Sequence, residues 1–391
     1  MSAARRVLAV VATHPIQYQV PWFQALAAEP SLDLTVYFAC LPDAQAQGAG
    51  FGIPFAWDIP LLDGYRWECL PNRRARPRLD RFFGSSTPGV GRVLAARKPD
   101  AVLVTGWNAW PLLQAILACR RLHLPVLLRG DSNALRDRPA PARFLHRRLF
   151  GQVAAFLSVG RSNRDFYAAN GVPAARIFDV PHFVDNARFA ASAAEARAQR
   201  AVLREQWRIP PGALCVLFVG KVEPKKRLAD LVHAAAAAAA QGVRLHLLVV
   251  GEGPLRLQAE AQAGGLGVPA TFAGFLNQSE LGRAYACADV LVLPSDAGET
   301  WGLVVNEAMA CGLPAVVSHL VGCGPDLVAE GVTGHTYPCG DVATLGTVLV
   351  RLARDPAACA AMGERARERV QAYSVARAVE GTRRAVDAVA A

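Results

Sequence analysis

Two short apolar runs frame the stretch that most constrains how this chain can fold. Val290–Leu293 and Ala315–Val317 are typical of strands buried in a parallel sheet. Between them lie a polar, glycine-bearing loop and a helical segment that begins near Gly302 and stops at Gly312. The order predicts a strand–loop–helix–strand unit whose loop leaves the carboxyl end of the first strand. The N–H groups of Gly302 and Leu303, at the start of the helix, are therefore a predicted anion site.

Two carboxylates flank this predicted anion site, Glu299 in the loop and Glu307 in the helix. Acids repel phosphate, so they are expected to bind another part of the ligand. A carboxylate accepts two strong hydrogen bonds from a diol. Phosphate, ribose and a second sugar together indicate a nucleotide sugar. An ordinary strand–helix–strand crossover with surface acids explains one such Glu, but not the whole string of about twenty residues.

The string from Pro294 to Pro314 resembles the signature of the retaining glycosyltransferases of family 4. It contains Pro-Ser, then Glu and Gly, a second Glu after seven intervening residues, and Ala-Met-Ala-Cys-Gly-Leu-Pro. The resemblance implies an α/β chain of the GT-B fold, with two Rossmann-like, doubly wound domains that face each other across a cleft. It covers residues 150–372 well and residues 1–150 loosely.

The length of 391 residues suits two α/β domains. Residues 190–211 are rich in alanine and charge and end in two prolines, which indicates an interdomain linker. The expected organisation is an acceptor-binding domain, a linker, a nucleotide-sugar-binding domain and a terminal helix that crosses back onto the first domain. The bounds are 1–190, 191–211, 212–375 and about 376–391.

The composition, 52% apolar and 19% charged, fits large buried sheets and argues against disorder. Nine cysteines are scattered singly, which favours a reducing cytosol over a disulfide-stapled secreted fold. Cys311 and Cys323 are interpreted as packing residues. No run reaches the roughly 18 apolar residues of a membrane span, so a soluble or peripheral protein is expected.

The formal charge of +10 lies in the first half of the chain. Residues 1–200 carry 25 Lys and Arg against 14 Asp and Glu, and residues 201–391 carry 17 against 18. A basic half implies an anionic partner, which is a phosphorylated substrate, a membrane surface or nucleic acid.

Two basic segments, Arg73–Phe83 and Arg136–Phe150, mix arginines with apolar side chains. Such mixtures suit an anionic bilayer surface, and the second segment has the pattern of a helix lying on a membrane. They also suit nucleic acid, and a solvated loop is an equal alternative for the first. A cytoplasmic chain that attaches peripherally to the inner face of the cell membrane is the expectation.

The candidate acceptor residues lie on loops that follow the first-half strands. The family usually has paired glycines after its first strand, whereas this chain has His14 and Gln17 there. Both can hydrogen-bond substrate hydroxyls, although structural capping by His14 is as plausible. Asn108 lies on a later cleft-facing loop. Arg129 and Asp131 stand about where the family usually carries a histidine.

The candidate donor residues lie in the second half. The family pattern of Gly-Arg, a short turn and Lys-Gly places its cations where this chain has Lys221 and Lys226. Cations on a turn at the carboxyl ends of parallel strands suit a diphosphate leaving group, and a merely solvated turn is the alternative. Residues 272–276 form a short strand and turn where the family holds the nucleobase. Further donor-binding candidates are Gly274, Phe275 and Trp301.

The resemblance implies transfer of a sugar from a nucleoside-diphosphate sugar, UDP more often than GDP, to an acceptor hydroxyl. Lys221 and Lys226 would neutralise the diphosphate, Glu307 would hold the ribose diol, and Glu299 would hold donor-sugar hydroxyls and support the transition state. Since there is no Asp-x-Asp box, we expect no metal and no cofactor. The acceptor is expected to be a lipid-linked or cell-envelope glycan.

Two other functions fit part of the sequence. A nucleotide-sugar epimerase of the same fold would need acid and base groups around the sugar, which the spacing of the two glutamates does not indicate. A basic nucleic-acid-binding protein explains the charge of the first half but not the motifs of the second, so no nucleic-acid partner is expected.

Overall fold

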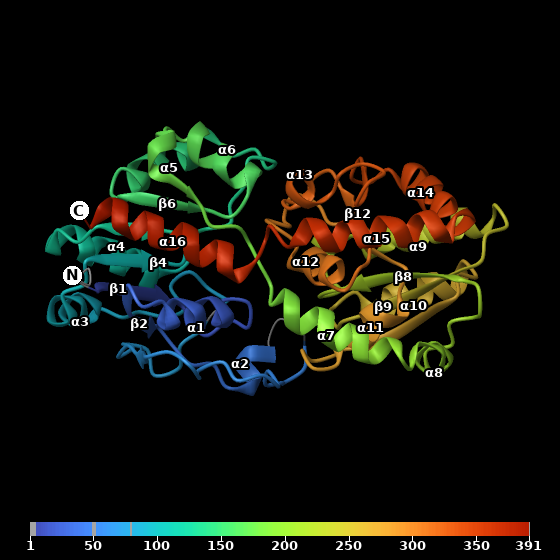
Figure 1. The fold of residues 1–391 in the computed structure, drawn as a ribbon, viewed down its shortest axis with the longest axis horizontal. Coiled ribbons are helices and arrows are strands. Elements are labelled where there is room, and N and C mark those ends of the chain that lie inside the picture. The colour runs from blue at the N-terminus through green and yellow to red at the C-terminus, as the bar shows by residue number, and fades with distance from the viewer. Residues whose placement is uncertain (1–4, 49–51, 79, 391) are drawn as a thin grey trace. The chain divides into compact units, whose positions relative to one another are not determined.

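The computed structural model describes residues 5–48, 52–78 and 80–390 of the chain. It divides into two compact units (Figure 1). The first unit holds residues 1–47, 59–182 and 375–391, and the second holds residues 48–58 and 183–374.

The first unit is built on a parallel sheet of seven strands in the order β3-β2-β1-β4-β5-β6-β7. Its central strands are continuous apolar runs, as expected where helices cover both faces. The strands are β1 (Arg6–Ala12), β2 (Leu32–Phe38), β3 (Trp67–Cys69), β4 (Ala101–Val104), β5 (Val126–Leu128), β6 (Ala155–Ser158) and β7 (Ile177–Asp179).

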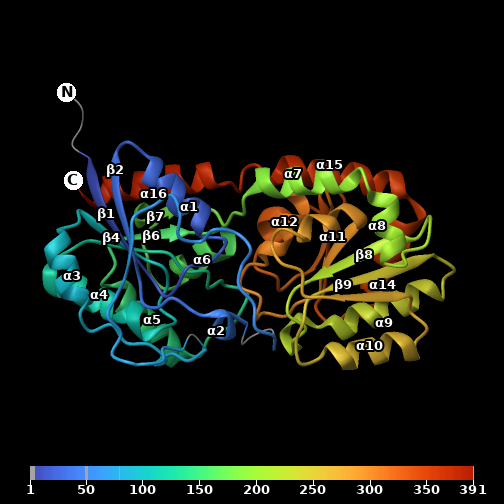
Figure 2. The ribbon, with the colours of Figure 1, turned by 90° about the horizontal axis from the view of Figure 1, so that it is seen from below.

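The terminal helix α16 (Val375–Val389) belongs to this first unit, where it packs on β6, β7 and α1 (Figure 2). Gly381 allows that packing, because a Cβ there would lie 2.0 Å from the carbonyl oxygen of Asp179. The other helices of the unit are α1 (Val20–Ala28), α2 (Ala44–Gly48, at its edge), α3 (Val90–Arg97), α4 (Trp110–Leu122), α5 (Ala140–Phe150), α6 (Arg161–Ala169) and the 3₁₀ turn η1 (Ala174–Arg176).

The second unit has a parallel sheet of six strands in the order β10-β9-β8-β11-β12-β13. The predicted strands on either side of the signature are β11 and β12, which are paired in parallel with Leu291 opposite Ala315. The strands are β8 (Leu214–Val219), β9 (Leu245–Val250), β10 (Ala270–Gly274), β11 (Val290–Leu293), β12 (Ala315–Ser318) and β13 (Gly334–Tyr337).

Helices lie on both faces of the second sheet (Figure 2). Asp341 and Asp355 cap α14 and α15, each accepting a hydrogen bond from a backbone N–H three residues on. The helices are α7 (Asn186–Arg197), α8 (Arg200–Gln206), α9 (Leu228–Ala239), α10 (Arg256–Gly265), α11 (Leu281–Cys287), α12 (Leu303–Ala310), α13 (Gly324–Leu327), α14 (Val342–Arg354), α15 (Pro356–Val370) and the 3₁₀ turn η2 (Pro224–Lys226).

Residues 191–211, predicted as a linker, are largely helical. They form the end of α7, the whole of α8 and the turn that leads into β8. Arg200 and Arg204 of α8 bind the carboxylate of Asp289 at 2.6 and 3.3 Å, which fastens this segment to the second unit.

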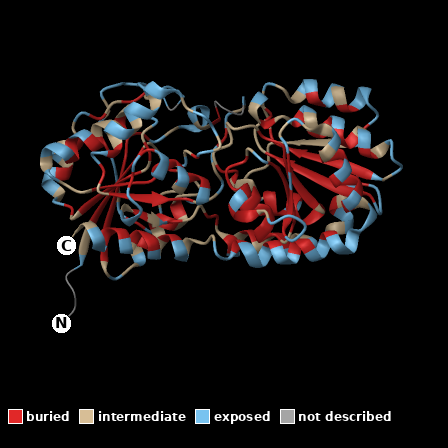
Figure 3. Ribbon diagram, turned by 90° about the horizontal axis from the view of Figure 1, so that it is seen from above, coloured by how far each residue is buried: buried red, intermediate tan, exposed pale blue. Residues whose placement is uncertain are grey.

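The apolar residues of the central strands of each sheet are buried, the edge strands β3 and β10 are only partly buried, and the outer faces of the helices are exposed (Figure 3). The nine cysteines are free thiols. Cys311 and Cys323, predicted as packing residues, are buried, and burial raises the pKa of both thiols. Each unit therefore has the double layer of helices around a parallel sheet that defines a Rossmann-like domain.

Candidate functional site

In the second sheet β8 and β11 are neighbours, and the strand order continues to β9 and β10 on one side and to β12 and β13 on the other. In open α/β sheets, ligands bind at such a switch point, outside the carboxyl ends of the strands. The loop after β8 carries Lys226, and the loop after β11 carries Glu299. Lys226 Nζ donates a hydrogen bond to Glu299 Oε2, and only 11% and 13% of the two side chains are exposed. The predicted catalytic cation and acid therefore form one buried ion pair at the switch point.

The two loops are also joined elsewhere. The N–H of Asp296 donates to the carbonyl oxygen of Lys225 at 2.9 Å. Within the loop after β11, Ser295 Oγ donates to Glu299 Oε2 at 3.2 Å. Lys221 lies on the same turn and is partly buried, and this loss of solvation lowers the pKa of its ammonium. Lys226 is fixed by its ion pair, whereas Lys221 contributes a partly desolvated positive charge.

Helix α12 begins at the predicted anion site. Gly302 has a φ of +99°, and a Cβ there would lie 2.7 Å from Leu293 Cδ2, so this position requires glycine. Gly302, at the N-cap, brings no side chain to the start of the helix, and the N–H of Val305 donates to the Gly302 carbonyl oxygen at 2.9 Å. Trp301 is buried, and its indole N–H donates to Asn306 Oδ1 at 2.8 Å. The Trp301 side chain therefore packs inside the protein, and its role in donor binding stays a prediction.

Glu307 is completely buried. Its Oε2 accepts a hydrogen bond of 2.5 Å from the hydroxyl of Tyr285 on α11. A carboxylate in this state is hidden from a ribose, so the predicted diol contact requires that Glu307 become accessible when a ligand binds.

Three glycines end the neighbouring strands β8, β9 and β10. A Cβ on Gly251 would lie 1.9 Å from the carbonyl oxygen of Gly220, and the Gly251 N–H donates to the carbonyl oxygen of Gly274 at 2.7 Å. The three strand ends are therefore packed backbone to backbone. Phe275, which follows Gly274, packs against Phe55 with ring centroids 4.4 Å apart and the ring planes tilted by 36°. Phe55 was not predicted from the sequence, because it lies far from this unit's other residues along the chain.

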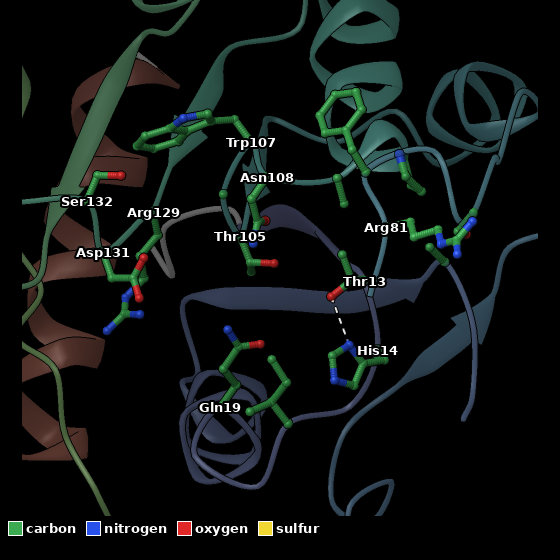
Figure 4. A pocket seen from close by; sticks show the side chains of 18 of the residues that line it. Thr13, His14, Gln19, Arg81, Thr105, Trp107, Asn108, Arg129, Asp131 and Ser132 are labelled. Atoms are coloured by element: carbon green, nitrogen blue, oxygen red, sulfur yellow. Dashed lines mark hydrogen bonds between the residues drawn. The ribbon is translucent and has the colours of Figure 1, made fainter. Parts of the chain in front are cut away.

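The first unit contains a cavity of about 300 Å³ at its own switch point, between β1 and β4. Figure 4 shows His14, Asn108 and Asp131 reaching it from the loops after β1, β4 and β5. Four of the five predicted acceptor residues line it. The sequence did not predict three hydroxyl-bearing residues that also line this cavity, although they too follow buried strands. They are Thr13, Thr105 and Ser132.

Gln17 is the predicted acceptor residue that the cavity lining does not include. The N–H groups of Gln19 and Val20 both donate to the carbonyl oxygen of Ile16, which forms a tight turn at the entry to α1. In this turn Ile16 and Gln19 reach the cavity wall instead. Gln19 is therefore the glutamine of this loop that lines the cavity, in place of the predicted Gln17.

His14 and Arg129 have their charge states set by burial. Burial lowers the pKa of His14 to about 4, so its imidazole is neutral at pH 7, and its Nδ1 lies 2.9 Å from Thr13 Oγ1. Burial also lowers the pKa of Arg129, to about 10, so the guanidinium stays charged. The guanidinium carbon Cζ of Arg129 lies 5.0 Å from the ring centroid of Trp22. His14 thus brings a neutral polar group to the cavity wall, and Arg129 a buried charge.

The basic segment Arg73–Phe83 carries an exposed aromatic cluster. The rings of Phe82 and Phe83 are 4.7 Å apart, and Trp110 lies 5.6 Å from Phe83. Phe83 is 60% exposed, and Arg73, Arg74 and Arg76 of the segment are exposed too. Leu79 lies outside the described residues. Arg81 lines the cavity near the same cluster.

The second basic segment contains the predicted helix, α5. Phe144 and Leu145 are 63% and 65% exposed beside exposed Arg143 and Arg147, whereas His146 packs inward against Trp107. Among residues 5–48, 52–78 and 80–390, no helix is both long and apolar enough to cross a membrane.

Comparison with known proteins gives the family. The model of glycosyl transferases group 1 matches residues 199–369. A GDP-mannose-dependent alpha-mannosyltransferase of Mycobacterium tuberculosis is 31% identical over 294 residues, 72% of this chain and 71% of the relative. Sulfoquinovosyl transferase SQD2 of Arabidopsis thaliana is 41% identical over 127 residues, 32% of this chain and 24% of the relative.

Other curated relatives are also matched over only part of their length, 37% and 42% for two of them. The structure of Anabaena Alr3699/HepE in complex with UDP has a TM-score of 0.74 at 16% identity, over 98% of this chain and 100% of that one, and shows a shared fold. The fold is GT-B, and the chain belongs to the glycosyl transferases group 1 family.

Proposed function

We propose that this protein is a retaining glycosyltransferase that moves a sugar from a nucleoside-diphosphate sugar to an acceptor hydroxyl. The observation that carries the proposal is the buried pair of Lys226 and Glu299 at the switch point of the second sheet. Family membership supports the same reaction class.

The cations act on the leaving group. As the bond between the anomeric carbon and the diphosphate oxygen breaks, negative charge gathers on the diphosphate. Lys226, held in place by Glu299, and Lys221 on the same turn provide fixed positive charge at the end of β8. Because protein cations supply this charge, the reaction is proposed to need no metal.

The helix start and the two acids bind the rest of the donor. The N–H groups of Gly302 and Leu303, at the start of α12, suit the distal phosphate. Glu299 keeps one oxygen, Oε1, for donor-sugar hydroxyls while Oε2 binds Lys226. Glu307 is assigned to the ribose, provided that ligand binding breaks its contact with Tyr285.

The acceptor is proposed to bind in the cavity of the first unit. In the tautomer whose Nδ1–H donates to Thr13 Oγ1, the Nε2 atom of a neutral His14 can accept a hydrogen bond from an acceptor hydroxyl. The acceptor oxygen forms the new bond on the face from which the diphosphate leaves, and its proton passes to the departing phosphate oxygen. This route needs no separate general base from the protein.

The nucleotide is proposed to be UDP rather than GDP, as the resemblance to the family implies. The Anabaena neighbour holds UDP, whereas the Mycobacterium tuberculosis relative is named as GDP-mannose-dependent. A direct comparison of the two nucleotides therefore decides this point.

The proposal is tested with a panel of UDP-sugars and GDP-sugars, by following nucleotide release with and without an acceptor mixture. Wild-type protein should turn over one nucleotide class, and Glu299→Gln should reduce the rate at least about 100-fold. Glu260→Gln, which changes a half-exposed acid on α10, is the matched control and should leave the rate unchanged. An isomerised nucleotide sugar without nucleotide release would favour an epimerase and reject the proposal.

We also propose that the first unit docks on an anionic membrane, which suits a lipid-linked acceptor and attachment to the inner face of the cell membrane. The exposed Phe82 and Phe83 can enter the interface while nearby arginines contact lipid headgroups. Sedimentation with vesicles tests this. Arg73→Gln, Arg74→Gln and Arg76→Gln together should weaken binding to phosphatidylglycerol vesicles, whereas Arg120→Gln with Arg121→Gln on α4 should not. Equal binding by both variants would reject this docking surface.

A further inference from the structure

Residues 52–58, which we name the strap, come between α2 and β3 in the chain but belong to the second unit. The strap packs on residues 275–279, the loop that follows β10. This loop carries Phe275, one of the predicted donor-binding residues. A segment of the first half of the sequence therefore helps to build the donor half of the protein.

Polar contacts hold the strap to the loop. Asp58 accepts hydrogen bonds from the Ser279 N–H, at 3.2 and 3.3 Å, and from the Ser279 hydroxyl. Asn277 Nδ2 donates to the carbonyl oxygen of Ala56 at 2.8 Å. On its other side the loop is held by α7, because Arg188 donates to Gln278 Oε1 at 2.7 Å. The position of the loop is therefore fixed from both sides.

Aromatic side chains form the contact surface between the strap and the loop. Phe55 is 9% exposed and lies 4.4 Å from Phe275 between ring centroids, and Trp57 lies 4.8 Å from Phe55 and 6.3 Å from Phe275. The indole Nε1 of Trp57 is buried and has no hydrogen-bond partner among the described residues. A buried N–H left without an acceptor is unfavourable, so a ligand that supplies an acceptor here gains affinity.

The neighbouring backbone suits a flat ligand. Gly274 has a φ of +74°, and a Cβ there would come within 3.2 Å of Glu252 Oε1. The backbone at the end of β10 therefore carries no Cβ at the residue before Phe275. Aromatic faces and an N–H donor together match a nucleobase, which stacks on rings and presents carbonyl oxygens at its edge.

We infer that Phe55 and Trp57 of the strap complete the nucleobase site, with Trp57 Nε1 donating to a carbonyl oxygen of the base. The inference rests on the proposed use of a nucleoside-diphosphate sugar. It adds to the donor site two residues from outside the matched family region, 199–369.

Calorimetric titration with UDP, GDP and pyrophosphate tests the inference without an acceptor. Trp57→Phe keeps an aromatic ring and removes the N–H, so the affinity for the preferred nucleotide should fall about five- to tenfold, as for one hydrogen bond. Pyrophosphate has no base, so its affinity should stay unchanged. Trp207→Phe replaces another partly exposed tryptophan of the second unit and should leave all three affinities unchanged.

The outcomes separate the two proposals. Wild-type protein that binds neither UDP nor GDP would overturn the proposed function, and the role of the strap with it. Nucleotide binding that is equal in wild-type protein and Trp57→Phe would overturn the inference alone. Equal losses for nucleotide and pyrophosphate would also overturn it, because they would show a general distortion of the donor site. Asp58→Ala, which detaches the strap from Ser279, should reproduce the nucleotide-specific loss.

Discussion

Replacing Lys226 by methionine separates the two roles that its ion pair with Glu299 can have. Methionine keeps most of the unbranched stem of lysine but removes the charge. The neighbouring Lys225 offers a matched control in the same turn, because it is 43% exposed and lies 3.3 Å from Glu223 at the surface. Lys226→Met and Lys225→Met therefore remove the same group from buried and exposed positions.

The loss of stability expected for Lys226→Met follows from the burial of the ion pair. Removing one partner of a buried pair typically costs about 3–5 kcal/mol, because the other charge is left without compensation. Glu299 would keep its hydrogen bond from Ser295, so we expect the lower end, about 3 kcal/mol, for Lys226→Met. For a unit of roughly 200 residues this lowers the melting temperature by about 6–12 °C. Lys225→Met should cost at most about 1 kcal/mol, as for surface pairs.

Activity distinguishes a catalytic pair from a structural one. Scanning calorimetry would measure stability, and nucleotide release would measure the rate, in Lys226→Met, Glu299→Gln and the double variant. The double variant carries no unpaired charge and should regain much of the lost stability. If the pair acts in catalysis, the rate of nucleotide release by the double variant should stay at least about 100-fold below that of wild-type protein. Recovery of the rate together with the stability, or a normal rate in Lys226→Met, would refute the reasoning.

Four further predictions follow from individual contacts and charges. Tyr285→Phe leaves Glu307 short of a donor and should lower the free energy of unfolding in urea by about 1–3 kcal/mol, and an unchanged value would show that the carboxylate is solvated. Gly251→Ala, whose Cβ meets a backbone oxygen at a φ of +136°, should cost at least about 2 kcal/mol, whereas Gly264→Ala in an open position should cost nothing. Burial lowers the pKa of His246 from 6.5 to about 4, so the unfolded chain takes up a proton first as the pH falls. Stability should therefore decrease from pH 6.5 toward pH 4, and His246→Gln should reduce this slope in urea titrations at each pH. Excess EDTA should leave the rate of sugar transfer unchanged, and restoration of a lost rate by Mg²⁺ would reject metal independence.

Local patterns predicted much of the fold because the features involved are local. The apolar runs that became β11 and β12, and the glycine stop of α12, are decided within a few residues. The same local patterns did not distinguish Gln17 from Gln19. Whether residue 17 or 19 reaches a cavity depends on how a tight turn starts the next helix, and hydrophobic periodicity does not report the rotation of a turn.

Contacts between distant segments were beyond sequence reasoning. The aromatic residues of the strap looked like part of a loop-rich stretch of the first domain, yet Phe55 packs on Phe275 of the second unit.

Residues 191–211 looked like a linker because they are rich in alanine and charge. Alanine also has the highest helix propensity, and the structure realises that preference in the end of α7 and in α8.

Strand order explains why residues with weak individual signals form sites. Lys226 and Glu299 are 73 residues apart, and β9 and β10 lie between them in the chain. They meet because β8 and β11 are neighbours, with β9 and β10 placed on the far side of β8. The first unit repeats this order, since β1 and β4 are neighbours while β2 and β3 lie to one side, and His14 and Asn108 line one cavity as a result. A chain that lacks the family's glycines after β1 therefore still has a cavity at that point, because strand order creates the space and the loop residues determine only its chemistry.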